Sequence, residues 1–132
     1  MALEASLREH LEADGAVAAR VGGRVYPVLL PPDVTYEAIS YRRISAPREH
    51  AQTGPSGLVR ARIQVDSWAT TYGGAKDLAE DVRRALDGFR GTMGTTVTTR
   101  VDSTMLEGDR DLYDEDAEVH RVQHDYLIWY GE

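Results

Sequence analysis

The fold is decided by residues 57–91, which read GLVRARIQVDSWATTYGGAKDLAEDVRRALDGFRG. At the start of this stretch apolar and polar residues alternate, and this period of two predicts a strand whose packed face is formed by Val59, Ala61, Ile63 and Val65. From Ala75 the apolar residues recur at the spacing of one stripe along a helix. We expect Thr70 or Thr71 to cap the start of that helix and Gly88 to cap its end. The stretch therefore predicts a strand followed directly by an amphipathic helix.

The segments on both sides extend this unit into one α+β domain. Leucines at helical spacing, an apolar run broken by prolines and further alternating segments mark the other elements. In chain order we expect helices over 2–14 and 16–21, an extended edge segment over 25–30, a strand over 38–45, a loop over 46–57, a strand over 94–106, an acidic loop or hairpin tip over 107–118 and a final strand over 119–130. This order predicts an antiparallel or mixed sheet of about four to five strands packed against two main helices.

Length and composition bound the kind of protein. A chain of 132 residues has the size of one domain and can bury a single core. It has no cysteine, which excludes disulfides, thiolate metal sites and cysteine nucleophiles. It has no apolar run near the roughly 20 residues that span a bilayer, and residues 1–15 lack the basic region of a signal peptide. We therefore expect a soluble protein of one domain, residues 1–132, without a membrane partner.

The formal net charge of −7 is distributed unevenly. Residues 1–66 hold 8 acidic and 8 basic residues, whereas residues 67–132 hold 14 acidic and 7 basic residues. An acidic chain lacks the basic surface that neutralises phosphates, which argues against sequence-specific nucleic-acid binding as its primary role. The charge instead favours contact with a basic protein partner.

Three patterns that could signal chemistry do not meet its requirements. His120 and His124 are four residues apart, which in a strand separates them by about 13 Å, too far for one metal ion. Residues 54–57, Gly-Pro-Ser-Gly, are one residue short of a nucleophile elbow and precede a strand. An acidic cluster lacks the glycine and the final glutamate of a calcium loop, and we expect a solvated loop from Asp109, Asp111, Asp114 and Asp116. The sequence thus predicts no catalytic, metal-binding or cofactor-binding residue.

Aromatic and basic side chains on the predicted strands are the candidate interaction residues. Trp68 and Trp129 fall on the less apolar faces of their strands, where they either pack under a loop or belong to a subunit interface. Both readings remain open. Five arginines lie on the strands predicted over 38–45 and 58–69 or in the loop between them, and they either form a solvated sheet face or pair with acids of a neighbouring subunit: Arg42, Arg43, Arg48, Arg60 and Arg62.

Residues mainly of the predicted strands and of the main helix, none of them a catalytic motif, match the pattern of a known family. They are Tyr41-x-x-Ile44-Ser45, the block 57–69, Ala75, Leu78-Ala79 and Leu86 of the predicted helix, Tyr113, and the closing YLIWY of residues 126–130. With these positions the chain resembles, over nearly its whole length, the tail completion or tail terminator proteins of long-tailed phages and prophages, typified by gene product 17. The resemblance implies an α+β protein of the virion that needs neither catalysis nor a cofactor.

The resemblance also implies a place of action and a set of partners. Six copies would form a ring on the head-proximal end of the tail tube, at the tail-neck junction, after assembly in the bacterial host cytoplasm. The ring would stop tube growth, contact the major tail tube protein and offer a surface to the head-tail connector protein. The free protein could be a monomer, and DNA would pass through the ring without specific binding. Two alternatives stay open: a head-side stopper or adaptor, and a small ligand-binding α+β domain.

A ring requires one patch of the chain to contact a different patch of the next copy. The sequence offers two unlike patches, namely the arginine-bearing strands 38–45 and 58–69 and the acidic segment 107–118 with Asp109, Asp111 and Asp114. We expect these patches to face neighbouring subunits or the tube end. The loop 46–57 either becomes ordered on docking with the tube or is merely a mobile loop, and both alternatives stay open.

Overall fold

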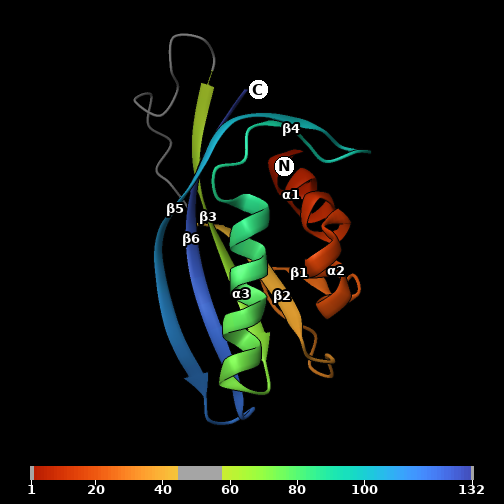
Figure 1. Ribbon diagram of the computed structural model, residues 1–132, viewed down its shortest axis with the longest axis vertical. Helices are drawn as coiled ribbons and strands as arrows, with labels where there is room; N and C mark the ends of the chain where they lie inside the picture. Colours follow the sequence, from red (N-terminus) through yellow and green to blue (C-terminus); the bar gives the residue numbers. More distant parts are fainter. Residues whose placement is uncertain (1, 45–57, 132) are drawn as a thin grey trace.

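Three helices and six strands form an α+β unit in the computed structural model, which describes residues 2–44 and 58–131 (Figure 1). The helices are α1 (Ala2–Ala13), α2 (Gly15–Val21) and α3 (Tyr72–Leu86). The strands are β1 (Val25–Pro27), β2 (Ala38–Ile44), β3 (Leu58–Ala69), β4 (Gly91–Met93), β5 (Thr99–Asp114) and β6 (Val119–Gly131). The fold class is the predicted one: the two main helices are α1 and α3, the short helix expected over 16–21 is α2, and the sheet has six strands where four to five were expected.

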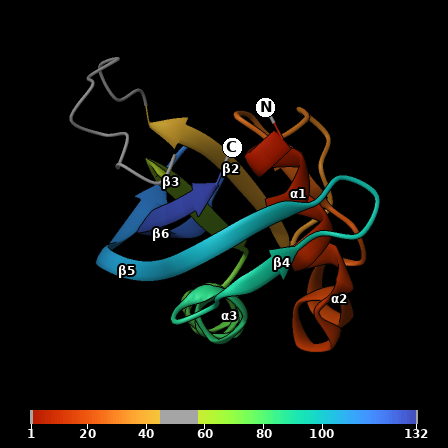
Figure 2. The ribbon, with the colours of Figure 1, turned by 90° about the horizontal axis from the view of Figure 1, so that it is seen from above.

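The strands form one mixed sheet in the order β1-β2-β3-β6-β5-β4. β1 runs parallel to β2, and each other neighbouring pair is antiparallel. β4, with 3 residues, is the strand that the prediction lacks, because so short a segment carries no readable periodicity. Figure 2 shows the helices against one side of the curled sheet. We call this side the helix face and the opposite side the open face.

Local sequence sets the two ends of α3. The Thr71 hydroxyl accepts a hydrogen bond from the amide of Gly74 at 3.0 Å, so Thr71 is the N-cap, one of the two residues expected. At the other end Asp87 is the C-cap, and Gly88 follows it in the left-handed region with φ of 83°. The expected glycine cap is therefore displaced by one residue: Gly88 makes the turn after the helix.

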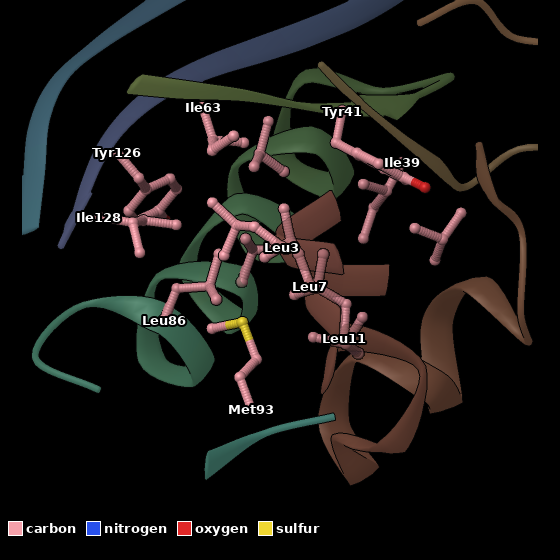
Figure 3. Close-up of a cluster of buried hydrophobic side chains, with 14 of the residues drawn as sticks. Leu3, Leu7, Leu11, Ile39, Tyr41, Ile63, Leu86, Met93, Tyr126 and Ile128 are labelled. Carbon is pink, nitrogen blue, oxygen red and sulfur yellow. The ribbon is translucent and has the colours of Figure 1, made fainter. Parts of the chain in front are cut away.

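The core lies between the helix face and the helices (Figure 3). Leucines at helical spacing on α1 meet alternate residues of the central strands; the cluster includes Leu3, Leu7, Leu11, Ile39, Tyr41, Ile63, Leu86, Met93, Tyr126 and Ile128. In the β3–β6 ladder Ile63 lies opposite Tyr126 and Ala61 lies opposite Ile128. Because the register is in phase, both strands present their apolar residues to the helices, as the alternation predicts.

The acidic segment 107–118 is the main departure from the expected structure. The predicted loop is wrong over most of its length, because β5 continues through Asp114 and only residues 115–118 form the turn to β6. The long strand β6 supplies the reason. It offers backbone partners as far as Val119, which lies opposite Asp114, and these outweigh the low strand propensity of the charged residues. The carboxylates stay at a solvated sheet edge.

The expected strand 94–106 begins only at Thr99, because a turn held by α1 precedes it. One carboxylate oxygen of Glu9 accepts three backbone hydrogen bonds, at 2.8, 2.9 and 3.2 Å, from Thr95, Thr96 and Val97. These bonds, led by the one from Thr95, lower the pKa of Glu9. The Ser6 hydroxyl donates to the Val97 carbonyl at 2.7 Å. Two side chains of α1 thus fix the β4–β5 turn.

The remaining expectations concern the first third of the chain. The helices predicted over 2–14 and 16–21 are confirmed by α1 and α2. The extended edge segment predicted over 25–30 is confirmed over 25–27 by β1 at the edge of the sheet, whereas Val28 leaves the extended conformation with φ of 67°. The predicted loop 46–57, with Arg48, lies outside the described residues. Within the described part of the chain, none of the helices has the length and apolar character of a membrane span.

Candidate assembly surface

The open face carries most of the side chains that the sequence singles out on the central strands. Arg60, Arg62 and Trp68 of β3 alternate with core residues, and Trp129 of β6 lies opposite Arg60. Arg42 of β2 belongs to the same face by its register with β3. The strand periodicity therefore orients both tryptophans as expected, away from the helices.

Arg43 is separated from this group because it follows Arg42 in a strand and points to the helix face. Its guanidinium donates to Glu4 of α1 at 3.1 Å and to the hydroxyl of Tyr130 at 2.9 Å. Arg43 therefore joins α1 to the sheet within one copy. This contact gives the side chain a structural role that the sequence could not assign.

Arg60 and Arg62 have different surroundings on the open face. The Arg60 guanidinium lies over the ring of Trp129, 5.6 Å from its centroid. Arg62 is paired within its own chain, with Nη2 at 2.8 Å from a carboxylate oxygen of Glu107. Glu107 lies at a register shift of β5, between Leu106 and Gly108. The acidic segment thus already neutralises one of the arginines that was expected to contact a neighbour.

The three candidate aspartates of β5 are divided between the two faces. Asp109 and Asp111 lie opposite His124 and Val122, on the helix face. The carboxylate of Asp111 accepts from the Tyr72 hydroxyl at 2.8 Å and pairs with Lys76 at 3.2 Å; these two donors lower its pKa. Of the three, only Asp114 lies on the open face, where it lines a cavity with Trp68 and Arg121. The structure therefore does not bring these aspartates together with Arg60 and Arg62.

Asp114 stabilises the turn between β5 and β6. One of its carboxylate oxygens accepts from the amide of Asp116 at 3.0 Å and from the amide of Ala117 at 3.2 Å. The turn is exposed and strongly acidic, with side chains of Asp114, Glu115, Asp116 and Glu118. Among the described residues none of these four carboxylates has a cationic partner.

A cavity of about 350 Å³ opens on the open face beside this turn. Its floor is formed by sheet residues, and its wall by the segment between β1 and β2, which includes Val28, Leu29, Pro31, Pro32 and Tyr36. A second cavity of about 380 Å³ lies over the acidic turn, and the two share Trp68, Asp114 and Arg121. We call the two cavities together the groove.

Buried polar groups form the floor of the groove. Asp66 is 5% exposed, and its carboxylate lies 3.5 Å from Arg121 and accepts from the Gln64 amide at 3.1 Å. Burial raises the pKa of Asp66, because it removes water from the charged form. Trp68 donates its ring N–H to Ser40 at 2.9 Å, and the Arg121 guanidinium lies 4.9 Å from its ring centroid. Ser40 and Arg121 together fix the orientation of the Trp68 ring.

Sequence reasoning missed Asp66, Arg121 and the apolar wall of the groove. The alternation of β3 assigns Asp66 to a polar face, but only the fold shows that residues 28–36 cover part of that face. The available signal was the apolar run ending in Pro31-Pro32. An apolar run that leaves the sheet has to pack against something or stay exposed, and here Val28 and Leu29 are 58% and 78% exposed.

Metal-ligating side chains do not converge in the described part of the chain, where no three His, Cys, Asp or Glu residues could share an ion. His120 and His124 both lie on β6, as expected for a strand. Buried His124 contacts the hydroxyl of Tyr126 through Nδ1 at 3.1 Å, and burial lowers the pKa of its imidazole. The His120 ring contacts the ring of Tyr113 in a tilted arrangement, at a centroid distance of 4.8 Å and an interplanar angle of 53°.

These features define an α+β protein in which the sheet has two different faces. The helix face holds the core, and the open face carries arginines, tryptophans and the groove, as in a protein that acts through contact surfaces. By its sequence the chain belongs to the family of the tail completion protein gp17, whose model matches residues 5–131. It is therefore a structural component of a phage-type tail. This confirms the resemblance inferred from the strand-helix block and the closing aromatic strand.

Comparison with solved structures supports the same fold. The chain is similar to a chain of the virion of a native gene transfer agent particle, with a TM-score of 0.75 and 21% sequence identity. The match covers 98% of this chain and 95% of that chain. At this identity the likeness concerns the fold. Comparison with curated protein sequences gave no significant match.

Proposed function

We propose that this protein forms a ring on the head-proximal end of the tail tube, stops growth of the tube and provides the surface to which the head attaches. The observation that carries the proposal is membership in the tail completion family over residues 5–131. Its partners are other copies of the chain in a hexamer, the major tail tube protein and the head-tail connector. DNA passes through the ring without specific binding, in keeping with the net charge of −7 of each copy.

The open face supports this proposal because it has the composition of a contact surface. Tryptophan and arginine are enriched at the centres of protein interfaces, and here the Arg60 guanidinium lies over the Trp129 ring on a sheet face that no described helix covers. A ring with a closed rotation needs two unlike patches on each copy. The open face is one such patch, and it faces the tube end or the neighbouring copy.

The role is tested by electron microscopy of particles from the parent phage or prophage after deletion of this gene. Overlong or irregular tubes without heads, together with filled tailless capsids, are the expected result. Tails of normal length that fail to join filled heads would refute termination. That result would identify a head-side neck component instead.

Charge variants test the open face when each is expressed in the deletion strain and the joined particles are counted by electron microscopy. Arg60→Glu is expected to reduce the yield of joined particles, because Arg60 has no carboxylate partner among the described residues and is available to another chain. Arg62 is different, since Glu107 pairs with it internally. The exchange of both charges, Arg62→Glu with Glu107→Arg, is expected to preserve assembly. Wild-type yields from the Arg60 variant would contradict the proposed contact of this face.

A further inference from the structure

The groove on the open face has the features of a docking site. Two exposed apolar side chains, Val28 and Leu29, stand on one wall, and Trp68 forms part of the floor. Val28 has φ of 67°, a left-handed conformation that is strained for a β-branched residue. Its amide donates to the Tyr41 carbonyl at 2.8 Å, which helps to hold this conformation. The wall is thus fixed with its apolar side chains directed to solvent.

The charged residues that line the groove indicate what kind of segment it can bind. Two arginines line it, Arg42 and Arg121, against four acids, Asp66, Asp114, Glu115 and Asp116. Arg121 is engaged by Asp66 and Trp68, whereas the acids of the turn have no cationic partner in the described chain. The complement of this groove is therefore a segment with an apolar side chain close to a free basic one.

The β4–β5 turn of this chain has these two features. Val97 is 37% exposed, and Arg100 is exposed and forms no ion pair with the described residues. The turn is also rigid, because Glu9 binds three of its amides and Ser6 binds its Val97 carbonyl. A segment held in one conformation loses little entropy on binding.

The turn and the groove lie at opposite ends of the molecule. In Figure 1 the β4–β5 turn is at the upper end, whereas the β5–β6 turn and the segment between β1 and β2 are at the lower end. One copy cannot bring them together. A contact between them is heterologous, the kind that builds rings.

We propose that the β4–β5 turn of one copy docks into the groove of the next copy, with Val97 against Leu29 and Trp68 and with Arg100 among the acids of the β5–β6 turn. The inference rests on the proposed ring and specifies its subunit contact. It also gives a reason for the three-amide clamp of Glu9, which presents the turn in a fixed shape.

Because the chain has no cysteine, disulfide cross-linking gives a direct test. The variant Val97→Cys with Leu29→Cys places one thiol on the turn and one on the groove wall, both at exposed positions. Air oxidation removes one hydrogen from each thiol, reduces oxygen and forms one S–S bond. Since the two sites are at opposite ends of one copy, the product has to link two copies. The matched control is Val97→Cys with Tyr72→Cys, whose second thiol is exposed on α3 outside the groove.

Docking is expected to make the groove pair cross-link about tenfold faster than the control pair or more, because it raises the local concentration of the two thiols. Adding Arg100→Glu should slow the groove pair, and adding Glu115→Arg as well should restore it. Equal rates for both pairs, or no linked product at high protein concentration, would overturn the proposed contact. The deletion phenotype is read separately, so a failed cross-link with overlong tubes would reject the docking site and leave tube termination in place.

Discussion

The buried pair His124 and Tyr126 on β6 gives a sharp prediction about stability. The Tyr126 hydroxyl lies 3.1 Å from Nδ1 of His124. Tyr126 is 0% exposed and His124 is 5% exposed. Burial raises the pKa of Tyr126 and lowers that of His124, so both are neutral near pH 7. A neutral imidazole that carries its proton on Nε2 can accept a hydrogen bond at Nδ1 from the Tyr126 hydroxyl.

Tyr126→Phe removes the hydroxyl and keeps the ring, so it opens no large cavity. The variant loses a hydrogen bond and leaves a desolvated imidazole nitrogen without its partner, which together cost about 1–3 kcal/mol of the free energy of unfolding. The assay is urea denaturation followed by tryptophan fluorescence and circular dichroism at pH 7. Tyr113→Phe is the control, because that side chain is 52% exposed and should change stability by less than about 0.5 kcal/mol. A loss below about 0.5 kcal/mol for Tyr126→Phe would refute the buried bond.

Two further predictions concern the same core. The lowered pKa of His124 means that the unfolded chain, with a value near 6.5, takes up a proton before the folded chain does. Stability is therefore complete above that pH and decreases as the pH falls below it, and the urea midpoint of the wild type should drop more between about pH 7 and pH 5 than that of His124→Phe. Parallel curves would contradict this. Leu7→Ala, at a position that is 0% exposed, should cost about 3 kcal/mol in the same assay, whereas Val97→Ala on the exposed turn should cost less than about 0.5 kcal/mol.

The strand and helix of residues 57–91 could be predicted because their signals are local. Alternation in β3 and the stripe of α3 each depend on residues within one element, and Thr71 lies next to the amides that it caps. The same parity argument, extended from Tyr41, assigns Arg43 to the helix face. Neighbouring arginines in a strand cannot share one surface, so the predicted basic patch had to divide.

The remaining features depend on contacts between distant segments. The Arg62–Glu107 pair requires β6 to lie between β3 and β5, an order that no local pattern reveals. The acidic segment becomes a strand because β6 is long enough to pair with it. The groove arises only where residues 28–36 fold over β3. Sequence patterns therefore identify elements and faces, while strand order and loop placement determine which charges meet.

Two features of the groove reduce the stability of an isolated copy of the protein. Asp66 is nearly buried on a sheet face that no helix of the described residues covers, and burial raises its pKa, so its charged form is less stable there than in water. Val28 holds a strained conformation at the rim, with its side chain 58% exposed. Stability of one copy alone would favour a neutral floor and a polar, relaxed rim. Such costs concentrate where a surface serves contact, because a second chain can cover the apolar wall and complete the charge pattern. The buried carboxylate and the strained rim therefore support the proposed docking of a second chain at the groove.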